Sequence, residues 1–245
     1  MKKESIGKQI VKSSFWNSSS MLISRTGALL FTIILTRLLG PENFGIYTLA
    51  VSISAIFLIL ADLGINQTMI RYVSSEAITN KEKATAYFKY LLKMKLSLAL
   101  FVSTSLLILA YPFAHHIFKK ELIFIPLILL SPYVFLVVIS SFFESLFFIF
   151  KKVNYLLIKE TIFQFIKISL AVFVLLTFNS IFFIKGIISG LIIANILTLI
   201  LILCLAKKTA PFIFKKTKKL IDKKRVLKYL GYSSLTITSA GILSY

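Results

Sequence analysis

Six long apolar stretches constrain this chain more than any other feature of its sequence. A transmembrane helix needs about 20 mostly apolar residues, and each of the six reaches that length. They occupy residues 17–38, 46–65, 91–111, 122–150, 155–178 and 181–206. A seventh stretch opens near Tyr229 and is still apolar at Tyr245. The pattern predicts an all-α polytopic membrane protein with six transmembrane helices plus the start of a seventh.

The composition indicates that lipid is the solvent of this fold. Hydrophobic residues make up 58% of the chain and charged residues only 16%, against about 45–50% and about 25% in ordinary globular domains. These values exclude a cytosolic enzyme, a secreted disulfide scaffold and a DNA-binding domain of the usual kind. The single cysteine, Cys204, lies inside an apolar stretch, where we expect it to behave as a small buried hydrophobic residue.

The basic residues indicate how the chain is oriented in the membrane. The formal net charge is +20, but Lys and Arg gather between the apolar stretches, so they predict topology and no nucleic-acid partner. With the N-terminus inside, residues 1–12, 71–95, 150–159 and 207–228 hold 23 of the 29 basic residues, and the outer loops and their edges hold 4. This excess follows the positive-inside rule. It predicts a multi-pass protein of the cell membrane with a cytoplasmic N-terminus.

Three segments follow from this topology. We expect an N-terminal six-helix membrane lobe over residues 1–206, a basic cytoplasmic amphipathic linker over 207–228 and a truncated seventh transmembrane helix over 229–245. The linker interleaves apolar side chains with ten Lys and Arg residues. Segments of this kind lie on the membrane surface and attract anionic lipid headgroups.

Polar residues in and beside the first apolar stretch predict a hydrated face. Five of them are spaced to share one helical stripe, namely Ser14, Ser18, Arg25, Thr32 and Thr36. A charged group in the bilayer core usually faces a bundle interior or a water-filled cavity. Arg25 is the first candidate for gripping an anion, and phosphate suits it because a guanidinium offers two parallel hydrogen bonds and stays charged. The alternatives are a structural ion pair with Asp62 or Glu144, and an arginine whose side chain snorkels to the membrane interface.

A second intramembrane cation extends this candidate site. Lys167 lies on one helical face with Glu160 and Gln164. We expect Lys167 and Arg25 to share one substrate cavity, with an internal Lys167–Glu160 salt bridge as the alternative. The expected polar lining of the cavity comprises Asn17, Ser18, Ser24 and Gln164.

Two carboxylates near helix ends, Asp62 and Glu144, are candidates for coupling transport to a cation or proton. Neutralisation of a neighbouring basic residue is the alternative role. Catalytic motifs are not found: there is no Gly-rich phosphate loop, no His-Glu-x-x-His and no plausible Ser/His/Asp set. We therefore expect no enzyme activity, cofactor or metal. A polytopic transferase would depend on His115 and His116, the two histidines of the chain.

Three motifs resemble one family of membrane proteins. They are ILTRLLGPENFGIYTLA at residues 34–50, LADLGINQTMIRYVS at 60–74 and KRVLKYLGYSSLTI at 224–237. Together they resemble the polysaccharide-transporter family of O-antigen and lipid-linked oligosaccharide flippases, within the multidrug/oligosaccharidyl-lipid/polysaccharide exporter superfamily. The chain is similar to the N-terminal half of such a protein.

The resemblance implies one lobe of a two-lobe exporter fold, with the substrate cavity between the lobes and transport by alternating access. It implies flipping of polyprenyl-pyrophosphate-linked oligosaccharide repeat units across the cytoplasmic membrane for surface polysaccharide or glycan assembly. Arg25 and Lys167 would then meet the pyrophosphate. The expected partner is a missing C-terminal lobe or a second chain. A cation-coupled drug exporter of the same superfamily and a non-transporting membrane scaffold are the alternatives.

Overall fold

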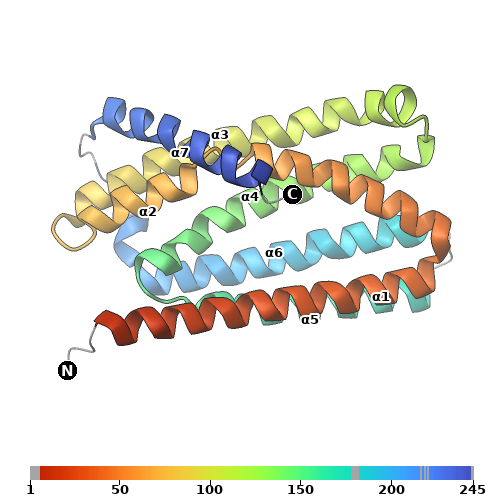
Figure 1. The fold of residues 1–245 in the computed structure, drawn as a ribbon, viewed down its shortest axis with the longest axis horizontal. Helices are drawn as coiled ribbons and strands as arrows, with labels where there is room; N and C mark the ends of the chain where they lie inside the picture. The colour runs from red at the N-terminus through yellow and green to blue at the C-terminus, as the bar shows by residue number, and fades with distance from the viewer. Residues whose placement is uncertain (1–5, 178–181, 216, 218, 220, 244–245) are drawn as a thin grey trace.

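The computed structural model describes residues 6–177, 182–215, 217, 219 and 221–243, with side chains described from Val11 to Ser234. Figure 1 shows an arrangement of long helices joined by short connections. In chain order they are α1 (Ile6–Leu60), α2 (Ile65–Glu76), α3 (Lys81–Pro112), η1 (Phe113–Ile117), η2 (Glu121–Ile123), α4 (Phe124–Ile149), α5 (Asn154–Thr177), α6 (Phe183–Thr209), η4 (Pro211–Phe214) and α7 (Lys223–Leu243). The described chain is therefore all-helical, as the apolar stretches predict.

α1 consists of two arms that meet at Gly40. The backbone of Gly40 has φ 74° and ψ 165°, a region open essentially to glycine alone. Pro41 follows, and proline fits the first turn of a helix because the N–H it lacks has no helical acceptor there. The chain reverses direction at this point (Figure 1). The arm over residues 41–60 is about 30 Å long at 1.5 Å per residue, which matches the hydrocarbon thickness of a bilayer.

Five described segments are long and apolar enough to cross a membrane: Val11–Leu60, Lys81–Ile117, Glu121–Ile149, Asn154–Thr177 and Phe183–Thr209. The first of them contains both arms of α1, and therefore the predicted stretch 17–38 and the part of 46–65 up to Leu60, where the helix ends. α7 is not among the five, so the count of six crossings plus a seventh stays a prediction. The predicted boundaries at residues 178 and 181, and the end at Tyr245, lie outside the described residues.

Several helices begin before the predicted apolar stretches, because hydropathy locates the apolar part of a helix and not its first turn. α3 starts well before residue 91, where the Asn80 side chain accepts a hydrogen bond from the Lys83 N–H at 3.1 Å. α7 starts before residue 229, next to a similar bond from the Arg225 N–H to the Asp222 carboxylate at 3.1 Å. Such side-chain acceptors satisfy the unpaired donors of a first helical turn. Caps fix these helix ends, and hydropathy does not report them.

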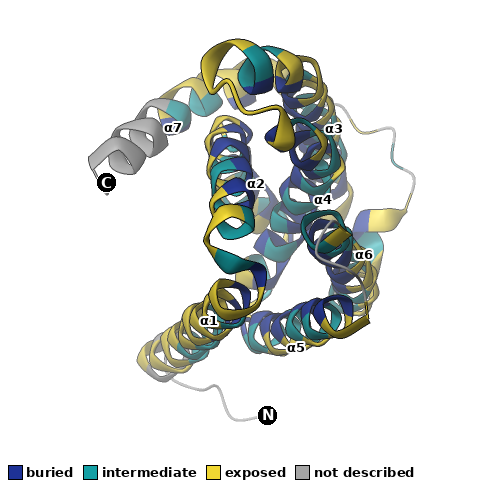
Figure 2. Cartoon of the chain, turned by 90° about the vertical axis from the view of Figure 1, so that its right-hand side faces the viewer, coloured by how far each residue is buried: buried dark blue, intermediate teal, exposed yellow. Residues whose placement is uncertain are grey.

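α4 lies at the centre of the bundle, in contact with α1, α2, α3 and α6. Figure 2 shows the buried sides of the helices turned inward around it. α1 also packs along α5, and α5 packs along α6. The facing surfaces of α1, α4, α5 and α6 enclose the polar residues described next. α7 lies against α2.

Candidate functional site

A largely buried cluster of three charges, Glu144, Lys159 and Glu160, lies between the end of α4 and the beginning of α5. The Lys159 ammonium is 3.0 Å from an oxygen of Glu144 and 3.2 Å from an oxygen of Glu160. The three side chains are between 11% and 23% exposed. With all three ionised, the cluster carries one net negative charge. It arises because the last turns of α4 and the first turns of α5 bring residues from two sides of a short connection together.

Gln164 extends this cluster by one helical turn toward the middle of α5. Its Nε2 donates to a Glu160 oxygen at 2.7 Å and to the backbone carbonyl of Ser24 on α1 at 3.4 Å. α1 approaches closely here, because a Cβ added to Gly27 would lie 2.5 Å from the Gln164 side chain. The Oε1 of Gln164 is buried and has no hydrogen-bond partner among the described residues. An unpaired buried acceptor is costly, which makes this oxygen a natural point for a donor from a ligand or water.

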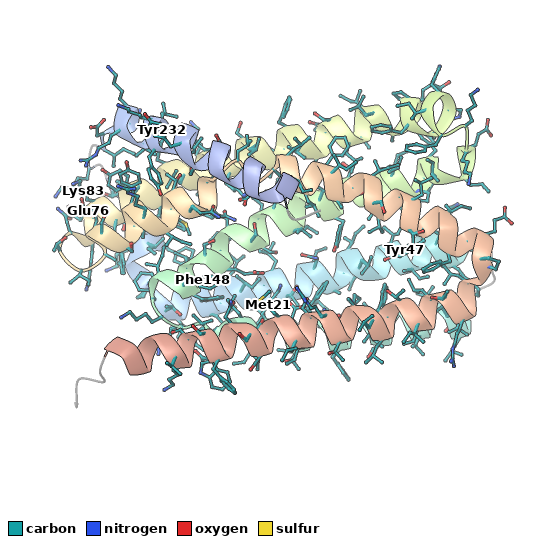
Figure 3. The ribbon with its side chains drawn as sticks, in the orientation of Figure 1. Met21, Tyr47, Glu76, Lys83, Phe148 and Tyr232 are labelled. Atoms are coloured by element: carbon teal, nitrogen blue, oxygen red, sulfur yellow. The ribbon has the colours of Figure 1, made fainter. Side chains whose placement is uncertain are left out.

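Two small cavities flank the cluster. One of about 230 Å³ is lined by Asn17, Ser20, Met21, Ser24, Glu144, Phe148, Leu156, Lys159 and Glu160. The other, of about 240 Å³, is lined by Ser24, Tyr133, Val137, Ser140, Ser141, Glu144, Lys159, Glu160, Phe163, Asn195 and Thr198. Figure 3 shows Met21 of α1 and Phe148 of α4 at the first cavity. The cavities share Ser24 and the three charged residues, so the ion pairs separate one space from the other.

Lys167 lies one turn beyond Gln164 and is buried, with 8% of the residue exposed. Its ammonium is 4.7 Å from the ring centre of Phe31 on α1 and 5.4 Å from that of Phe163. Aromatic faces attract cations at these distances. No acidic side chain of the described part of the chain lies within ion-pair distance of Lys167. The alternative salt bridge with Glu160 is wrong, because Glu160 pairs with Lys159 instead.

Arg25 is exposed, and the structure does not bring it together with Lys167. Lys167 packs against the buried Phe31 on the inner side of α1, whereas Arg25 belongs to the exposed side. Neither residue lines the two cavities beside the charge cluster. The other members of the predicted stripe, Ser14, Ser18, Thr32 and Thr36, are exposed as well. The stripe therefore lies on an open face of α1, which it shares with the exposed Leu22 and Leu29.

Asp62 and Glu144 are not neighbours. The Asp62 carboxylate is 3.4 Å from the ammonium of Lys95, which also donates to the Ala61 carbonyl at 3.0 Å. The Lys95 side chain is only 1% exposed. This pair ties α3 to the end of α1, just before the left-handed Gly64. The alternative of an ion pair with Arg25 is wrong for both carboxylates, since each has a lysine partner.

Sequence reasoning missed Lys159 and Lys95 as buried residues. Both were counted among the basic residues of the inner segments, because each lies at the margin of an apolar stretch. A signal was present for Lys159, since it follows a stretch that carries Glu144 near its end and stands beside Glu160. A lysine between two carboxylates at neighbouring helix ends has partners within reach. Of the predicted lining, Asn17, Ser24 and Gln164 lie at the cluster, and Ser18 faces away.

Comparisons with known proteins agree with this architecture. The family model described as "Polysaccharide biosynthesis protein" matches residues 10–245. No curated protein matches the chain. Three solved structures are similar to the chain over 96% of its length.

The first of these structures is an outward-facing multidrug-resistance MATE family transporter of the MOP superfamily, with 17% identity and a TM-score of 0.68. The second is a MOP superfamily transporter from Pyrococcus furiosus, described by a binding pocket of reverse polarity, with 18% identity and a TM-score of 0.67. The third is MATE in complex with Br-NRF, with 19% identity and a TM-score of 0.69. The chain spans 53%, 53% and 55% of these proteins, about half of their length. At these identities the likeness shows the fold.

Proposed function

Because the chain belongs to the polysaccharide biosynthesis protein family, a branch of the transporter superfamily whose fold it shares, we propose that it forms one lobe of a lipid-linked oligosaccharide flippase. The transported unit is an oligosaccharide on polyprenyl pyrophosphate, moved across the cell membrane for surface glycan assembly. The second lobe comes from further chain or from a second molecule. The N-terminus and the basic segment 207–228 lie on the cytoplasmic side, where anionic headgroups bind that segment.

The exposed position of Arg25 on the open face of α1 carries this proposal. Arg25 lies about midway along a helix that is long and apolar enough to cross a membrane. An arginine facing lipid at that depth is costly, and no acidic side chain of the described residues neutralises it by an ion pair. A water-filled cavity against an opposing lobe removes this cost. A pyrophosphate in that cavity is then matched by a cation that keeps its charge and binds two oxygens at once.

The buried cluster supports a second role within the same transporter. Glu144 and Glu160 compete for one ammonium, so the cluster has one carboxylate charge in excess. A proton or a small cation that enters beside Ser24 would neutralise that excess. Gln164 links the cluster directly to the α1 backbone, so a change of its charge acts on the helix that carries Arg25. Lys167 holds the same two helices together through Phe31.

This cluster also favours one second candidate function, cation-coupled export of a drug or other small molecule. Drug export would depend on the carboxylates Glu144 and Glu160 inside the lobe, and it would not require Arg25 to bind the transported molecule. Under this alternative, neutralising Glu144 abolishes transport while replacing Arg25 has little effect. Under the flippase proposal, both residues matter for lipid-linked sugar movement.

Inverted membrane vesicles from cells that produce the protein separate the two functions. One set receives a fluorescent polyprenyl-pyrophosphate-linked sugar, and the other a cationic dye. Flipping of the lipid-linked sugar without dye transport supports the proposal. Dye transport without movement of the lipid-linked sugar would contradict it and favour drug export.

A further inference from the structure

A basic pocket at the end of the bundle that holds the beginning of α1 is separate from the candidate site described above. It has a volume of about 490 Å³ and is lined by Lys12, Ser13, Trp16, Phe150, Lys151, Lys152, Val153 and Asn154. The lining comes from two parts of the chain, the first turns of α1 and the connection between α4 and α5. Neither Arg25 nor any member of the buried charge cluster lines it.

The electrostatics of this pocket favour an anion. Three of its lining residues are lysines, and none is acidic. α5 begins at Asn154, so the positive end of that helix adds to the field inside the pocket. Lys151 adopts a left-handed backbone conformation with φ 54°, which is uncommon for a residue with a side chain. Lys151 and Lys152 of this connection are both exposed and both line the pocket.

The aromatic side of the pocket favours a lipid over a free ion. Trp16 and Phe150 line the same space as the lysines, and tryptophan prefers the depth where headgroups meet hydrocarbon. Val11 and Phe15 stand beside this part of α1, exposed by 70% and 64%. They provide an apolar surface along which acyl chains can extend from a headgroup held at the lysines.

We propose that this pocket binds the phosphate headgroup of an anionic phospholipid, with Lys12, Lys151 and Lys152 as the cationic contacts and Trp16 beside the upper acyl chain. The site is independent of the proposed transport function and differs from the basic segment 207–228. It fixes the beginning of α1 to the connection between α4 and α5 through a shared ligand. An anionic lipid of the inner leaflet would then stabilise the packing of the beginning of α1 against the connection between α4 and α5.

The sequence supplies its own probe, because Trp16 is the single tryptophan of the chain. The full chain is reconstituted in vesicles of phosphatidylcholine that contain increasing fractions of phosphatidylglycerol with brominated acyl chains. Quenching of the Trp16 emission is compared with quenching by brominated phosphatidylcholine. We expect half-maximal quenching at an about fivefold lower fraction of phosphatidylglycerol, the effect of about one lysine at a charged surface.

The variant K151Q/K152Q tests the contacts, and K119Q/K120Q is the matched control at the far end of the bundle. We expect the first variant to lose the preference for phosphatidylglycerol and the second to keep it. Elution on size exclusion and the lipid-free Trp16 emission maximum identify any variant that fails to fold, in which case the single substitution K152Q replaces it. Equal quenching by the two lipids in the unmodified chain would overturn the proposal. Reversal of the quenching by millimolar inorganic pyrophosphate would also overturn it, since the pocket would then serve a pyrophosphate-bearing ligand.

Discussion

At the scale of single residues, two lysines inside this protein are paired with carboxylates. Lys159 bridges Glu144 and Glu160, and Lys95 pairs with Asp62. Removing one partner of a buried ion pair lowers the free energy of unfolding by more than the intact pair contributes to it. The reason is that the remaining charge stays in a poorly solvated place without a counter-charge. The Lys159 cluster and the Lys95–Asp62 pair differ in the exposure of their side chains. We therefore make a separate stability prediction for each.

Replacing Lys159 with Met leaves two neighbouring carboxylates without their shared cation. We expect the free energy of unfolding to fall by about 3–5 kcal/mol, measured by SDS titration in mixed micelles. Lys120→Met, at an exposed position, is the control and should change little. Adding Glu144→Gln and Glu160→Gln to Lys159→Met should recover most of the loss. A single variant as stable as the unmodified protein would show that the cluster has no structural role.

Asp62 and Lys95 predict an asymmetry. Asp62→Asn leaves an ammonium that is 1% exposed without a carboxylate, whereas Lys95→Met leaves a carboxylate that is 33% exposed and can take up water. We therefore expect Asp62→Asn to lower the free energy of unfolding by more than Lys95→Met does. The same SDS titration checks it. The opposite order would mean that Lys95 is already hydrated in the folded protein.

At the scale of helices, backbone geometry and caps explain what hydropathy could not predict. The apolar stretches located the membrane helices because burial in lipid needs long apolar runs. They could not locate the beginnings of α3 and α7, which polar caps at Asn80 and Asp222 determine. Gly40 and Pro41 fall between the predicted stretches 17–38 and 46–65, and both residues have a backbone reason to be at a turn.

Gly40 and Gly45 form a matched pair for testing the turn. Neither Cβ would meet an atom within 4 Å, so substitution by Ala acts through the backbone alone. Gly40→Ala should cost about 1–3 kcal/mol at its left-handed, extended conformation, while Gly45→Ala inside the helix should gain about 0.5–1 kcal/mol. Equal effects of the two substitutions on the free energy of unfolding would contradict the hairpin geometry of α1.

At the scale of the whole molecule, the polar residues are divided between an inside and an open face. The sequence identified Arg25, Gln164 and Glu144 as polar positions in membrane helices, and the structure describes all three there. It could not tell which of them face one another, because helical spacing fixes the side of one helix and not the neighbour it meets. For this reason Arg25 and Lys167 were expected together, although Arg25 lies on the exposed side of α1 and Lys167 of α5 packs against the buried Phe31.

The ends of the bundle give a prediction about topology. Lys12 and Lys152 share a pocket at one end. Lys120 belongs to the connection between α3 and α4, which Figure 1 shows at the other end. The expectation that Cys204 is buried is wrong, because the structure has it exposed. Single cysteines at positions 12, 120 and 152 are therefore made in a Cys204→Ser background and labelled with a membrane-impermeant maleimide. We expect labelling at 12 and 152 from the cytoplasmic side and at 120 from the opposite side. Labelling of all three from one side would contradict the membrane orientation of the helices.

The most direct test of the central claim is the rate at which lipid-linked sugar is flipped when Arg25 is changed. The claim is that this cation on the open face of α1 binds the pyrophosphate. Flipping is measured in inverted vesicles for Arg25→Ala, Arg25→Lys and, as the control on the same helix, Arg37→Ala. We predict a loss of about tenfold or more for Arg25→Ala, the effect of a lost charge-assisted hydrogen bond, a smaller loss for Arg25→Lys and little change for Arg37→Ala. Unchanged flipping in Arg25→Ala would contradict the account.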